Sequence, residues 1–132
     1  MIPANKTSRW KIKIYTDKVN KLNKPNDEPE IFIGIGPSNP YDEQNFYAHC
    51  WLFSTSNSML IVNQKRYSPY KGHSGKLSKG DIVEIIVNRN LGQLSFAING
   101  SNYGIAYSKL PKEENLYPIV FLSQEILKVE IT

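Results

Sequence analysis

The sequence has a single cysteine, Cys50, and two histidines among its 132 residues. One cysteine cannot close a disulfide within the chain, and so few nitrogen and sulfur ligands cannot build a structural zinc site. Apolar runs are short: Ile82 to Val87 is broken by Glu84, whereas a membrane span needs about 20 apolar residues. The opening residues, Met1 to Lys6, lack the apolar core of a secretory signal. These absences exclude disulfide-rich secreted, zinc-binding, haem and membrane proteins, and they favour an intracellular location, cytoplasmic or nuclear.

The composition is that of an ordinary globular domain. Hydrophobic residues make up 40% of the chain and charged residues 21%, and 132 residues suffice for one domain with a real core. The net charge of +4 comes from 16 Lys and Arg against 12 Asp and Glu. Because most of this excess is lysine, it is typical of a solvated surface, and we expect neither a membrane nor nucleic acid as the main partner.

Hydrophobic residues alternate with polar ones along almost the whole chain, which is the period of β-strands. No segment shows the i, i+3, i+4, i+7 spacing of an amphipathic helix. Turn residues separate the apolar segments, so the pattern predicts an all-β fold, an antiparallel two-sheet sandwich. The nine expected strands are Trp10–Ile14, Ile31–Ile35, Cys50–Ser54, Met59–Val62, Val83–Val87, Leu94–Ile98, Tyr103–Tyr107, Tyr117–Leu122 and Ile126–Ile131.

Counting strands predicts which connections share an end of the sandwich. If every connection reverses the chain direction, residues 37–49, 63–79, 99–102 and 123–125 gather at one end, and residues 17–30, 55–58, 89–92 and 108–115 at the other. The first end is rich in ring and guanidinium side chains, which binding hot spots favour, and the second has no aromatic residue. The ring and guanidinium side chains of this first end are Tyr41, Phe46, Tyr47, Arg66, Tyr67 and Tyr70.

Residues that could support catalysis do not form a recognisable set. Ser74 follows His73 directly in a glycine-rich turn, and neighbours in sequence rarely pair as nucleophile and base. Cys50 lies beside Trp51 in an apolar strand, which favours a buried inert thiol over a nucleophile. The two glycines Gly34 and Gly36 indicate a strand that passes close to another backbone. We therefore expect neither an enzyme nor a cofactor.

Several short motifs resemble the SPRY domain. They occur in the family's order: Gly80-Asp81 before a long strand, Leu94-Ser95-Phe96, the Asn99-Gly100 turn, Gly104-Ile105-Ala106-Tyr107, and Leu116-Tyr117-Pro118. The resemblance covers essentially Trp10 to Ile131, which predicts a single domain over residues 10–132 after an N-terminal extension of residues 1–9. It implies a concanavalin-like sandwich of two antiparallel sheets.

The resemblance also implies a protein–protein interaction module that holds a peptide or a partner surface. In family members with a peptide site, that site includes the loop after the Val-Gly strand and the late turn, here residues 37–49 and 123–125. This chain has Gln124 and Glu125 where such members carry Trp-Gly, so their peptide specificity is not transferred. The expected partner-binding residues are Tyr41, Phe46, Tyr47, Arg66, Tyr67, Tyr70, Gln124 and Glu125.

Other functions compete with this interpretation, and several properties stay open. Exposed Tyr and Asn side chains on a sandwich also suit carbohydrate binding, and the Lys-rich stretch from Lys65 to Lys79 suits single-stranded nucleic acid, although acidic residues dilute that charge. SPRY modules occur in adaptors among other proteins. The sequence does not indicate which partner is bound or which oligomeric state forms.

Overall fold

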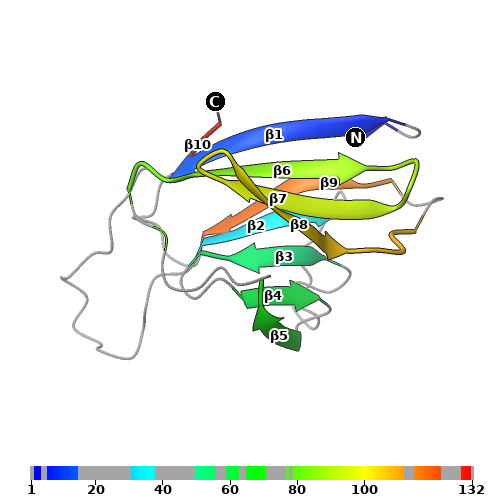
Figure 1. Ribbon diagram of the computed structural model, residues 1–132, viewed down its shortest axis with the longest axis horizontal. Coiled ribbons are helices and arrows are strands. Elements are labelled where there is room, and N and C mark those ends of the chain that lie inside the picture. Colours follow the sequence, from blue (N-terminus) through cyan, green and yellow to red (C-terminus); the bar gives the residue numbers. More distant parts are fainter. Residues whose placement is uncertain are drawn as a thin grey trace.

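The computed structural model describes residues 2–3, 6–14, 31–37, 50–55, 59–62, 65–70, 77, 79–111, 115–122 and 129–131. All secondary structure in these residues is β-strand and turn, which confirms the predicted all-β fold (Figure 1). The ten strands are β1 (Thr7–Ile14), β2 (Ile31–Gly36), β3 (Trp51–Ser54), β4 (Met59–Val62), β5 (Lys65–Pro69), β6 (Ile82–Asn88), β7 (Gln93–Ile98), β8 (Ser101–Tyr107), β9 (Tyr117–Leu122) and β10 (Val129–Ile131).

The strands form two five-stranded antiparallel sheets that face each other. The first sheet has the order β10-β1-β6-β7-β8 and the second β5-β4-β3-β2-β9. In the first sheet Trp10 pairs with Ile85, and Ile85 pairs in turn with Phe96. In the second sheet Ile33 lies between Phe53 and Val120. These registers place the apolar members of each strand on a common face.

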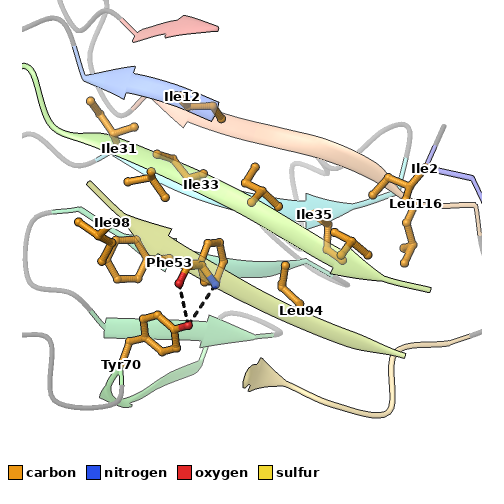
Figure 2. Close-up of a cluster of buried hydrophobic side chains, with 14 of the residues drawn as sticks. Ile2, Ile12, Ile31, Ile33, Ile35, Phe53, Tyr70, Leu94, Ile98 and Leu116 are labelled. Atoms are coloured by element: carbon orange, nitrogen blue, oxygen red, sulfur yellow. Dashed lines mark hydrogen bonds between the residues drawn. The ribbon is translucent and has the colours of Figure 1, made fainter. Parts of the chain in front are cut away.

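The core lies between the sheets and follows from the two-residue alternation. Ile31, Ile33 and Ile35 of β2 point inward and meet the inward side chains of the other sheet (Figure 2). Val83 and Ile85 of β6 are completely buried among them. Each such burial contributes about 1.5–3 kcal/mol. The inward side chains whose alternation identified the strands thus also supply the apolar burial that stabilises the fold.

The first strand begins earlier than the sequence pattern suggested. β1 starts at Thr7, three positions before Trp10, because the alternation continues through Ser8. Ile2 is only 2% exposed and packs into the core, and its backbone N–H donates to the carbonyl of Leu116 at 2.7 Å. Residues expected to form an extension therefore help to close one end of the sandwich.

One strand was missed, and the omission changes which connections share an end. β5 was assigned to the loop 63–79 because Lys65-Arg66-Tyr67-Ser68-Pro69 lacks apolar alternation. It is an edge strand, where charges and proline are common. An additional reversal of the chain exchanges the ends of every later connection. We expected the strands that flank residues 37–49 and those that flank residues 123–125 to meet the same end of the sandwich. They meet opposite ends, so this expectation is wrong.

The two ends can be named by the residues at which strands finish. At the Ile14 end, β1, β3, β5, β7 and β9 finish; at the Gly36 end, β2, β4, β6 and β8 finish. Two hydrogen bonds of the connection between β5 and β6 show that β1 and β3 finish at the same end of the sandwich. The Leu77 N–H donates to the carbonyl of Thr55, just after β3, at 2.8 Å, and the Gly80 N–H donates to the carbonyl of Ile14, the last residue of β1, at 2.7 Å. The strands that flank residues 38–49 meet the Gly36 end, and those that flank residues 123–128 meet the Ile14 end.

Candidate partner-binding surface

The expected partner-binding residues have different positions in the structure. Tyr41, Phe46, Tyr47, Gln124 and Glu125 lie outside the described residues. Arg66 and Tyr67 lie in β5, at the edge of the second sheet, where Arg66 pairs with Ile61 of β4. Only the position of Tyr70 contradicts its expected role.

Tyr70 is a core residue and cannot contact a partner. It is 0% exposed and its ring packs edge-on against Phe53 and Phe96, with centroid distances of 6.0 and 5.8 Å. Its hydroxyl oxygen accepts the Phe96 N–H at 3.0 Å (Figure 2), and its proton is donated to the carbonyl of Phe96 or Gly104. Burial raises the pKa of this phenol, so it stays protonated. The ring thus lies between the sheets, against Phe53 of the second sheet and Phe96 of the first.

Tyr107 makes a similar connection in the opposite direction. It belongs to β8 of the first sheet, and its hydroxyl lies 2.8 Å from the carbonyl oxygen of Leu52 and 3.0 Å from that of Ile61, in β3 and β4 of the second. Its one proton can be donated to either. Tyr70 and Tyr107 therefore join the two sheets along the side bounded by β5 and β8, which we call the β5–β8 side.

At the Gly36 end, the turn between β6 and β7 presents an exposed apolar side chain. Leu91 is 61% exposed. The turn around it is held by two hydrogen bonds: the Leu91 N–H donates to the side-chain oxygen Asn88 Oδ1, and the Leu110 N–H donates to the Gly92 carbonyl, both at 3.0 Å. Gly92 has a φ of 66°, a conformation that favours glycine. The structure thus holds a large apolar side chain in water on a well-defined turn.

Sequence reasoning missed Leu91 because strand counting placed residues 89–92 at the end without aromatic side chains. The available signal was a leucine between Asn90 and Gly92, inside a turn where apolar residues are uncommon. In the structure this turn lies at the Gly36 end, as do Gly36 and Cys50, which flank the segment with Tyr41, Phe46 and Tyr47. Two other large apolar side chains are exposed in the described part of the chain, Ile105 at 41% and Ile131 at 75%.

Cys50 has the environment of an inert thiol. It is completely buried against the apolar side chains of Phe32 and Leu52. Burial raises the pKa of its thiol to about 11, so the thiolate is scarce at neutral pH. Within the described residues no group of three or more His, Cys, Asp or Glu side chains could hold a metal ion.

The residues of the sequence motifs stabilise the fold. Asn99 has a φ of 52°, accepts the Ile82 N–H at 2.9 Å and donates to Asp81 Oδ1 at 3.0 Å, so the Gly80-Asp81 and Asn99-Gly100 motifs are bonded together. A Cβ atom on Gly34 would lie 1.9 Å from the carbonyl oxygen of Trp51, which confirms the predicted close backbone approach. None of the described residues forms a helix that is long and apolar enough to span a membrane.

Comparison with known proteins agrees with this fold. A search of curated proteins finds no match. Among solved structures, the SPRY domain of human HERC1 superposes with a TM-score of 0.73 over 98% of this chain and 76% of that chain, at 19% sequence identity. The sequence model of the SPRY domain matches residues 27–132, most of the chain. The chain therefore belongs to the SPRY domain family.

Proposed function

We propose that this protein is a non-catalytic module that binds a peptide or a partner surface through the Gly36 end of its sandwich. SPRY domains are a family of protein-interaction modules, and the fold leaves the choice of ligand to side chains outside the core. The observation that carries the proposal is the exposure of Leu91 on a turn fixed by hydrogen bonds. The buried Cys50 thiol supports an intracellular setting, where cysteines stay reduced.

An exposed leucine on a rigid turn suits a binding site for two physical reasons. Burying it against a partner gains about 1.5–3 kcal/mol, and a turn that is already ordered loses little entropy on binding. Tyr41, Phe46 and Tyr47 belong to the segment between Gly36 and Cys50, and in our proposal they add apolar contacts around Leu91. Arg66 and Tyr67 follow the β4–β5 turn at the same end and complete the candidate set.

The remaining three residues of the sequence-based set do not belong to the proposed site at the Gly36 end. Tyr70 is removed because it is buried. Gln124 and Glu125 follow β9, which finishes at the Ile14 end, so we propose them as contacts only for a partner that spans both ends. The proposal therefore rests first on Leu91 and the segment 38–49.

Selecting peptides from a random display library on the immobilised domain would test the proposal. We expect Leu91→Asn to weaken the affinity of a selected peptide at least tenfold, and the double variant Tyr41→Ala, Tyr47→Ala to weaken it as well. Ile131→Asn is the matched control, because it removes an apolar side chain that is even more exposed than Leu91 but lies in β10, and it should change the affinity less than twofold. Equal affinities of Leu91→Asn and the unmodified domain would refute the proposal.

A further inference from the structure

The edge of the first sheet contains a stretch of β1 that has a strand on one side only. β1 pairs with β6 from Thr7 to Lys13, but with β10 only from Ile12 to Ile14. Within the described residues, no strand lies beside Thr7 to Lys11 on the side away from β6. Figure 1 shows β1 forming the border of its sheet, with the short β10 beside one part of it. Five residues of β1 thus form an open sheet edge.

The direction of the backbone groups along this edge follows from Ile14. Its N–H donates to the Asp81 carbonyl at 2.9 Å, and its carbonyl accepts from Gly80 N–H, so both groups face the chain that leads into β6. Backbone groups of successive residues in a strand point to opposite sides. Those of Trp10 and Ser8 therefore face β6 as well, whereas those of Lys11, Arg9 and Thr7 face the open edge.

The side chains along the edge have a definite chemistry on each face of the sheet. On the outer face Arg9, Lys11 and Lys13 form a row of cations, and the two carboxylates beside them are Glu84, 3.3 Å from Arg9, and Glu130, which pairs with Lys13. Because Lys6 adds a fourth cation before β1, positive charge exceeds negative charge here. On the inner face Trp10 is only partly buried, and Ile131 is 75% exposed where β10 ends.

We propose that this open edge, Thr7 to Lys11, pairs with an extended segment of a partner protein in which acidic and apolar residues alternate. The segment adds a strand to the sheet by main-chain hydrogen bonds. Its acidic side chains lie on the outer face near Arg9 and Lys11, and its apolar side chain covers Trp10 and Ile131. This edge begins at the Gly36 end, where Thr7 pairs with Asn88. The added strand binds the main chain of β1 and not the Leu91 side chain, so it does not depend on the function proposed above. The competing explanation is that the lysines only keep other strands away from the edge.

The test uses a capped synthetic peptide, Glu-Ile-Glu-Val-Glu, titrated into the domain and followed by NMR shifts of the β1 amides. The informative pair of variants is Arg9→Pro and Arg9→Ala. Both lose the contact with Glu84, but only proline removes the edge-facing N–H, and it leaves the hydrogen bonds to β6 in place. We expect Arg9→Pro to bind the peptide at least fivefold more weakly than Arg9→Ala. If Arg9→Pro does not fold, Thr7→Pro against Thr7→Ala makes the same comparison.

Three further measurements sharpen the result. A Lys-Ile-Lys-Val-Lys peptide should bind at least tenfold more weakly than the acidic one, because the row of cations repels it. The double variant Lys11→Glu, Lys13→Glu should weaken binding of the acidic peptide, whereas Lys109→Glu, a charge reversal just after β8 at the opposite edge of this sheet, should not. Equal binding to the proline and alanine variants, no binding of the acidic peptide at millimolar concentration, or amides of Arg9 and Lys11 already protected from exchange in the peptide-free domain would overturn the proposal.

Discussion

The β5–β8 side of the sandwich and the side of β1 and β10 differ in how far side chains join the two sheets. On the β5–β8 side, the hydroxyls of Tyr70 and Tyr107 cross between the sheets, and two register shifts interrupt the pairing of β7 with β8. On the side of β1 and β10, the last strand has three residues and Ile131 is 75% exposed. The first side uses its tyrosines to join the two sheets, although Ile105 of β8 is 41% exposed there, and the second leaves Ile131 in water without such a connection. Residue type alone therefore does not show which side meets a partner.

Removing the Tyr70 ring should have the largest effect on this comparison. Tyr70→Ala creates a cavity beside Phe53 and Phe96, and we expect a loss of about 3–5 kcal/mol in the free energy of unfolding, measured by urea denaturation. Tyr70→Phe keeps the ring but leaves the Phe96 N–H without its acceptor, which should cost about 1–3 kcal/mol.

Ile131→Ala is the matched control for this prediction because its side chain is already exposed. It should change the free energy of unfolding by less than about 0.5 kcal/mol. Similar losses for Tyr70→Ala and Ile131→Ala would mean that Tyr70 does not close the β5–β8 side.

Gly34 tests a close approach in the middle of the second sheet, away from both sides. A Cβ atom there would lie 1.9 Å from the Trp51 carbonyl oxygen and 2.9 Å from Leu52 Cα, so backbone atoms must move. We expect Gly34→Ala to cost about 1–3 kcal/mol, the range typical of overpacking, in the same denaturation experiment. Gly36→Ala meets only the side chains of Ile119 and Cys50, and should cost less. A stable Gly34→Ala variant would show that β2 and β3 lie further apart.

Asn99 tests the turn between β7 and β8 on the β5–β8 side, and its substitutions have the smallest expected effect on stability. Asn99→Gly tolerates the positive φ but loses the bonds to Ile82 N–H and Asp81, and should cost about 0.5–1.5 kcal/mol by thermal denaturation. Asn99→Ala loses the same bonds and adds backbone strain, so it should be less stable than Asn99→Gly. The opposite order of the two variants would contradict the role of the turn conformation.

The sequence predicted the strands better than their arrangement. Alternation identified the regions of nine strands because burial of one face imposes a two-residue period, and it failed for β5, an edge strand with Lys65, Arg66 and Pro69. That one omission assigned later connections to the wrong end. The inward direction of Tyr70 could not be predicted, because it depends on the space that Phe53 and Phe96 leave between the sheets. The exposure of Leu91 depends in the same way on which turns surround it.

The central claim is that a partner binds at the Gly36 end, and hydrogen exchange of the domain with and without a selected peptide tests it most directly. We predict slower exchange in residues 89–92 and in residues 37–50 when the peptide is bound, with the amides around Tyr70 unchanged. Slower exchange confined to the Ile14 end, at residues 99–102, with no change around Leu91, would contradict the claim.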